Sequence, residues 1–175
     1  YYQHLSWIFF SGCYLLFLLP AIGAISEILP TFSGKPLLSR GAVATSMAAI
    51  AVLGLLAWMQ NMFTASIPIG FLYFAMAAAV LLLVPFGLLF VNWLGTLASG
   101  AIELRAPMLF ALGAISTLSF GLAGELGHAV IPVNWLLADT MDATAATGYV
   151  LVGGPVLGGL AALHYWYPKL TGRLM

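Results

Sequence analysis

The sequence predicts an all-α integral membrane protein, a bundle of about five transmembrane helices. Hydrophobic residues make up 63% of the 175 residues and charged residues only 6%, whereas a soluble domain usually carries about 25% charged residues. A hydrocarbon core about 30 Å thick needs roughly 20 apolar residues per helix, and five apolar runs are long enough. Because no break between them could hold an extramembrane domain, we expect a single membrane domain over residues 1–175.

Turn residues and charges mark the ends of the expected spans. The segments PTFSGKPLLSR, TASIP, ELRAP and HAVIPVN separate the apolar runs. Pro85 removes a backbone hydrogen bond and is expected to kink the third span. In the fifth span, Gly154 and Gly158 have the small-x-x-x-small spacing that lets another helix approach closely. The spans are expected at about 5–29, 41–64, 68–98, 107–128 and 135–167.

The basic residues predict the orientation in the membrane. Every lysine and arginine follows the first, third or fifth span, and none follows the second or fourth. Under the positive-inside rule the N-terminus is outside and the C-terminus cytoplasmic, in what we take to be a bacterial inner membrane. The five acidic residues balance this charge, so nothing indicates a nucleic-acid partner. The basic residues are Lys35, Arg40, Arg105, Lys169 and Arg173.

Glu125, Asp139 and Asp142 form a candidate polar cluster at the outer end of the fourth and fifth spans. Asp139 and Asp142 are three residues apart and share a helix face, and ionisable groups near membrane depth are functional candidates. No lysine or arginine lies on this side to pair with them. A solvated rim or a salt bridge to another subunit is the alternative. His128 and His164 lie at opposite span ends, where we expect interfacial placement.

Six blocks of the sequence resemble a known family in order and at nearly matching spacing. They are QHLSWIFFSGCYLLFLLPAIGAISEILPTFSGKPL, LAWMQNMFT, VPFGLLFVNWLGTLASG, LRAPMLFALG, ADTMDATAATGYVL and HYWYPKLTGRLM. Together they are similar to helices six to ten of subunit I of the haem-copper oxidases, the cytochrome c oxidase type. The resemblance covers almost the whole chain. It implies part of that subunit's fold and a place among other membrane subunits of a respiratory complex.

The resemblance also implies five metal-ligand histidines, and this sequence has none of them. Ser11, Gln60 and Asn61 stand at the copper-ligand positions. Ala146 stands where the oxygen-binding haem takes its ligand, and Gly148 where the electron-transfer haem does. Neutral imidazole binds both copper and haem iron, and none of these residues replaces it. The sequence therefore predicts a degenerate site, with no haem or copper bound by this chain.

Other functional positions that the resemblance implies are also lost. Leu15 stands at the position of a tyrosine cross-linked to a copper ligand, and Leu89 at that of a proton-path lysine. Ala138 replaces a histidine of an outer magnesium site, of which only Asp139 remains. Proton uptake by the usual route therefore has no ionisable relay here.

Three functions stay open at this point. The first is a non-catalytic subunit with a structural or assembly role in a larger respiratory complex, surrounded by other membrane subunits and lipid. The second is a fragment of an active oxidase completed by other chains, and the third a small proton-conducting or solute-conducting module. Because interiors pack densely, we expect the vacated metal site to be closed by side chains such as Phe10, Met59 and Met62, or filled by a lipid tail.

Overall fold

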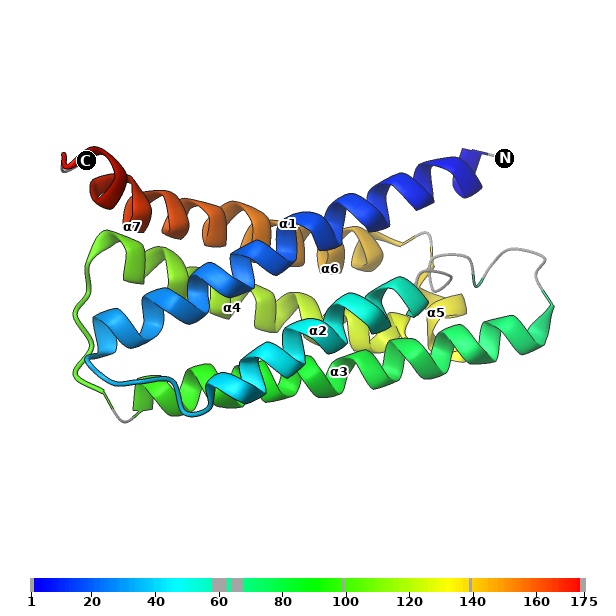
Figure 1. Ribbon diagram of the computed structural model, residues 1–175. Coiled ribbons are helices and arrows are strands. Elements are labelled where there is room, and N and C mark those ends of the chain that lie inside the picture. Colours follow the sequence, from blue (N-terminus) through cyan, green and yellow to red (C-terminus); the bar gives the residue numbers. More distant parts are fainter. Residues whose placement is uncertain (1, 58–62, 64–67, 99, 139, 174–175) are drawn as a thin grey trace.

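The computed structural model describes residues 2–57, 63, 68–98, 100–138 and 140–173, with side chains from residue 13 onward. Regular structure in these residues is helical throughout, and the long helices lie side by side as a bundle (Figure 1). The elements are α1 (Tyr2–Ser33), α2 (Arg40–Leu56), α3 (Ile69–Ala98), α4 (Ala106–His128), α5 (Ile131–Leu137), α6 (Met141–Leu151), the π-helical segment η2 (Val152–Gly158) and α7 (Gly159–Thr171).

The prediction of a helical membrane protein is confirmed. Four helical stretches among the described residues are long and apolar enough to cross a membrane: Cys13–Ser33, Ile69–Ala98, Ala106–His128 and Met141–Thr171. The second expected span corresponds to α2, which has 17 residues. That span was expected to reach residue 64, and residues 58–62 and 64 lie outside the described ones. Helix α3 continues without a break through the buried Pro85.

The last span begins later than expected, at Met141 rather than at residue 135. Residues 131–137 form the separate short helix α5, and the chain then becomes extended at Ala138, whose ψ is 140°. Thr140 starts the next helix, because its hydroxyl accepts a hydrogen bond from the Asp142 amide at 3.3 Å. Such a cap satisfies one of the free N–H groups in the first helical turn. The span then runs through α6, η2 and α7.

Side chains of α3 hold the loop between α1 and α2. The Asn92 amide donates to the Ser39 carbonyl at 2.9 Å, and the Thr96 hydroxyl accepts from the Leu38 amide at 3.2 Å. The next loop satisfies the end of α1, since the amides of Ala101 and Glu103 donate to the last two carbonyls of that helix. These loops lie at one end of the bundle, together with the start of α4 and the end of α7 (Figure 1). We call it the basic end, because these segments carry the lysines and arginines.

Glycines bring the last span into close contact with α1 and α4. A Cβ added at Gly154 would collide with the Leu18 side chain of α1, and one at Gly158 would lie 2.9 Å from Ala21 Cβ. On the side of α4, a Cβ at Gly153 would lie 2.6 Å from Thr117 Oγ1 and 2.7 Å from the Leu118 amide nitrogen. The backbone of η2 therefore lies directly against both neighbours.

Gly153 and Gly159 differ in what surrounds them, and this predicts different effects of an alanine substitution on stability. Gly153→Ala is expected to destabilise the protein by about 1–3 kcal/mol, because the new methyl group meets rigid backbone of α4. Gly159→Ala meets nothing within 4 Å and should be neutral or stabilising by about 0.5–1 kcal/mol. Thermal unfolding of both variants in mild detergent measures the difference. Equal melting temperatures would contradict the close contact between η2 and α4.

Candidate functional site at the expected metal-ligand positions

The first expected haem-ligand position, Ala146, is buried against α4. Its side chain is 2% exposed. A Cβ added at Gly124 of α4 would lie 2.8 Å from Ala146 Cβ, and one at Gly121 would lie 3.2 Å from the Ala146 carbonyl oxygen. The two helices therefore touch here through small residues on both sides. An imidazole at residue 146 has no space unless α6 moves away from α4.

The second expected haem-ligand position, Gly148, has a different environment. A Cβ added there meets nothing within 4 Å. Residues two apart on a helix differ by about 200° in direction, since each turn holds 3.6 residues. Ala146 and Gly148 therefore face opposite sides of α6, and only Ala146 lies in a packed interface.

The expected copper-ligand positions lie partly outside the described structure. Ser11 belongs to α1, where only its backbone is described, and Gln60 and Asn61 are outside the described residues. Nearby on α1, Leu15 contacts α2, because its two methyl carbons lie 2.9 Å from where a Cβ of Gly54 would be. The sequence also predicts that Phe10, Met59 and Met62 fill the vacated metal site. Their side chains lie outside the described ones, so this stays a prediction.

The chain following Gln60 and Asn61 is anchored at Phe63. This residue is buried with Leu72, Ala75 and Ile131, and its carbonyl accepts a hydrogen bond from the Trp135 indole of α5 at 3.0 Å. The short helix α5 thus joins the segment before α3 to the end of α4.

Leu89, at the expected proton-path position, is part of the largest apolar core. Its side chain is 0% exposed and belongs to the cluster that includes Leu18, Ile22 and Trp93. A lysine there would place an ammonium group among apolar side chains, which costs several kcal/mol unless it is paired or neutralised. The packing around residue 89 suits a hydrocarbon side chain.

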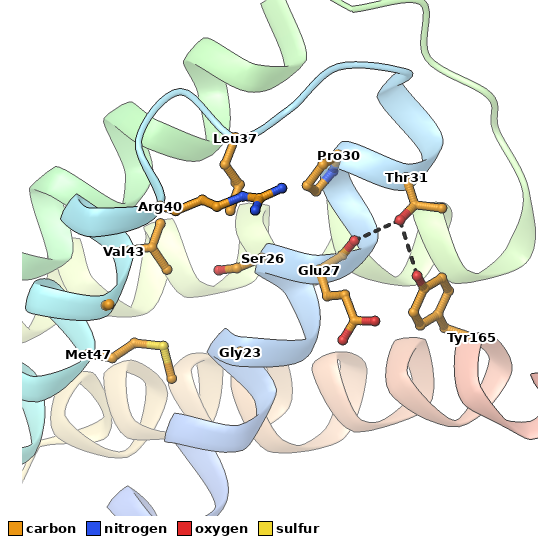
Figure 2. Close-up of a pocket in the computed structure, with 11 residues that line it drawn as sticks. Gly23, Ser26, Glu27, Pro30, Thr31, Leu37, Arg40, Val43, Met47 and Tyr165 are labelled. Carbon is orange, nitrogen blue, oxygen red and sulfur yellow. Dashed lines mark hydrogen bonds between the residues drawn. The ribbon is translucent and has the colours of Figure 1, made fainter.

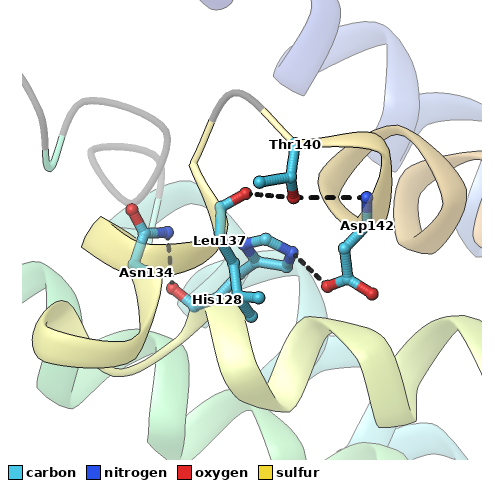
Figure 3. Close-up of polar contacts among 5 residues, drawn as sticks. All are labelled: His128, Asn134, Leu137, Thr140 and Asp142. Carbon is cyan, nitrogen blue, oxygen red and sulfur yellow. Dashed lines mark hydrogen bonds and ion pairs between the residues drawn. The ribbon is translucent and has the colours of Figure 1, made fainter.

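At the end of the bundle opposite the basic end, His128 pairs with Asp142. His128 Nε2 lies 3.2 Å from Asp142 Oδ2, and the two side chains are 9% and 52% exposed. Figure 3 shows the imidazole held between α4 and α6, with the Asn134 amide donating to the His128 carbonyl at 2.9 Å. Lysine and arginine are absent from this side, but a histidine can also pair with a carboxylate. The sequence contains three histidines, and only the fold shows that His128 is the one that contacts Asp142.

The rest of the expected outer cluster is only partly described. Glu125 lies one turn before His128 on α4 and takes part in an interaction within the bundle. Asp139 lies outside the described residues. Within the described ranges, no group of three or more histidine, cysteine or acidic side chains lies close enough to hold a metal ion. Of the expected outer cluster, the contact that the structure gives with its distance is the one between Asp142 and His128.

Residues 1–175 match the family described as cytochrome c and quinol oxidase polypeptide I. The chain belongs to this family. It is 36% identical over 174 residues to cytochrome c oxidase subunit 1 of Synechocystis sp., which covers 99% of this chain and 32% of that protein. It is 38% identical over 175 residues to the subunit 1 of Alkalihalophilus pseudofirmus, covering 99% of this chain and 28% of the relative.

A third relative, cytochrome c oxidase subunit 1 of Cereibacter sphaeroides, is 33% identical over 172 residues, which cover 98% of this chain and 30% of that protein. The chain spans about a third of the length of the curated relatives it matches. The oxidase family inferred from the six sequence blocks is therefore confirmed. The haem and copper that the family implies do not fit the residues at the expected positions, because alanine and glycine carry no ligand atom and serine and carboxamides do not replace imidazole.

The two expected haem-ligand positions allow a matched test of the packing. Ala146→His is expected to destabilise the protein by about 1–3 kcal/mol, because the imidazole is forced into the contact between α6 and α4. Gly148→His adds the same group where nothing lies within 4 Å and should change stability by less than about 1 kcal/mol. Thermal unfolding in detergent measures both. A stable Ala146→His variant would show that the contact with Gly124 is not maintained.

Proposed function

We propose that this chain is a non-catalytic subunit of a terminal-oxidase-type respiratory complex, related to subunit I and serving the structure or assembly of that complex. The main support for this proposal is the environment of Ala146, where α6 packs on α4 and leaves no space for a metal-ligand side chain. A haem-binding subunit needs that volume open and an imidazole in it. In this proposal, the residue at one haem-ligand position of an oxidase, Ala146, has become a packing residue.

The other expected positions support the same proposal. Ser11, Gln60, Asn61 and Gly148 offer no imidazole, and Leu89 completes an apolar core instead of carrying a proton. The degeneracy thus extends over copper, both haems and the proton path. Another chain could supply a single missing ligand. Losses at every one of these positions favour a subunit that has no catalytic role.

The exposed apolar surface supports membership of a larger assembly. Helix α3 presents large exposed side chains along much of its length, among them Phe71, Phe74, Leu81, Leu88 and Val91. In the proposed assembly, other membrane subunits and lipid cover these faces. We further propose that the chain lies in a bacterial inner membrane with its basic end in the cytoplasm, because the positive-inside rule places lysines and arginines on that side.

Metal analysis and optical spectroscopy test the non-catalytic role. The tagged chain is purified from its native membrane with the subunits that accompany it, and then separated from them. We expect less than about 0.1 iron or copper per separated chain and no haem band in the reduced-minus-oxidised spectrum, because the chain lacks the imidazoles that both metals need. The matched control is the Cereibacter sphaeroides subunit 1, treated in the same way.

Haem absorption with stoichiometric iron on the separated chain would contradict the non-catalytic proposal and favour the active-fragment alternative. Copper retained at one equivalent would do the same. A chain that purifies alone, with no other membrane protein, would contradict the place in a larger complex and leave the metal result to stand by itself.

A further inference from the structure

A pocket of about 510 Å³ opens at the basic end of the bundle, between α1, the start of α2 and α7 (Figure 2). This volume lies within the range of sites for small molecules. Its lining has two parts. Apolar atoms of Gly23, Val43, Ala44 and Met47 form the side toward the membrane interior, and polar groups gather toward the helix ends. The polar residues are Ser26, Glu27, Thr31, Arg40 and Tyr165.

Four of the five polar residues already have partners. The Ser26 hydroxyl donates to the Ile22 carbonyl at 2.8 Å and accepts from the Trp93 indole at 2.9 Å. The hydroxyls of Thr31 and Tyr165 are 3.1 Å apart. Glu27 lies 4.0 Å from the Lys169 ammonium group, which offsets its charge.

Arg40 is the exception. Figure 2 shows its guanidinium extended across the loop side of the pocket toward Pro30. Within the described ranges it has no carboxylate within 4.0 Å, whereas Arg105 is paired with Glu103 at 3.0 Å. Arg40 is also the first residue of α2, where the helix dipole favours a negative charge. Of the two charged residues that line the pocket, Glu27 therefore has Lys169 beside it, and Arg40 has no carboxylate partner among the described residues.

We propose that this pocket binds one phospholipid with a net negative headgroup. The phosphate pairs with Arg40 at the start of α2, and the upper part of one acyl chain lies along Val43, Ala44 and Met47. A lipid suits the pocket better than a soluble anion does, because the apolar lining continues from the polar end toward the membrane interior. A basic residue at the cytoplasmic surface attracts anionic lipid. This inference does not depend on the metal content of the chain.

Native mass spectrometry of the delipidated complex tests the proposal, with the palmitoyl-oleoyl forms of phosphatidylglycerol and phosphatidylcholine added as probes. We expect one phosphatidylglycerol per chain, and binding about tenfold weaker in Arg40→Gln, since a charge-assisted hydrogen bond is lost. The control is Arg173→Gln, which removes the same charge from the exposed C-terminal segment and should leave binding unchanged. Inorganic phosphate at millimolar concentration should not compete.

A second variant tests the apolar part of the pocket. A Cβ added at Gly23 would lie 3.6 Å from the Met47 methyl group. The variant Gly23→Phe therefore places a ring in the pocket while every charge is kept. It should also weaken phosphatidylglycerol binding at least about tenfold, with size-exclusion and thermal unfolding confirming a folded protein. If this variant is unfolded, Ala44→Phe at the exposed side of the same lining replaces it.

Three results would overturn the proposal. Equal losses in Arg40→Gln and Arg173→Gln would reduce the effect to general surface charge. Equal binding of phosphatidylcholine, or competition by phosphate, would remove the requirement for an anionic lipid. A photoreactive residue at position 47 that cross-links to another subunit and not to lipid would show that an acidic protein segment fills the pocket.

Discussion

The bundle depends on the direct contact of the η2 backbone with α1 on one side and α4 on the other. In a membrane, lipid tails are as apolar as leucine, so helices gain little from the hydrophobic effect when they associate. They associate through van der Waals contact, which is strongest where backbones approach closely. Gly153 faces α4, and Gly154 and Gly158 face α1. Leu18 and Leu118 fill the space that these glycines leave and are almost fully buried. This packing positions the last span so that Ala146 contacts α4 at Gly124. The lack of space for a larger side chain at residue 146 follows from it.

Helices α2 and α3 are joined to this central group by polar contacts as well as by apolar packing. The Trp93 indole of α3 donates to Ser26 of α1, and Asn92 forms hydrogen bonds in both directions with the backbone of Ser39. Side chains of α3 provide hydrogen-bond partners for loop backbone at the basic end, where an unpaired buried N–H or C=O group would cost free energy. At the opposite end the pair of His128 and Asp142 connects α4 with α6. Polar contacts thus order the helix ends at both ends of the bundle.

Features set by local sequence could be predicted, and features set by contact between distant segments could not. The ends of α3 and α4 agree with the expected spans because Pro68, Pro107 and the charged segment before Pro107 mark them directly. The break between α5 and α6 was not predicted, since the fifth span was expected to run without interruption from residue 135, whereas the extended Ala138 and the Thr140 cap separate two helices there. The sequence shows that Ser11, Gln60, Asn61, Ala146 and Gly148 are not histidines, while their assignment as ligand positions stays a prediction. The burial of Ala146 was not evident from the sequence, because it depends on Gly124, and the partner of Asp142 depends on how the chain turns between α4 and α6.

The π-helical segment Val152–Gly158 has a consequence for the rotational phase of the last span. It contains Pro155, which cannot donate the hydrogen bond that an α-helix requires at that position, and the wider turn adds in effect one residue to the helix. One residue rotates all later side chains by about 100° relative to an uninterrupted α-helix. The face that α6 presents to α4 and the face that α7 presents to α1 are therefore set separately. Deleting one residue of this turn would leave Ala146 in place but rotate Tyr165 and Lys169 away from Thr31 and Glu27. The residues of α6 that contact α4 and the residues of α7 that contact α1 can therefore change independently of each other.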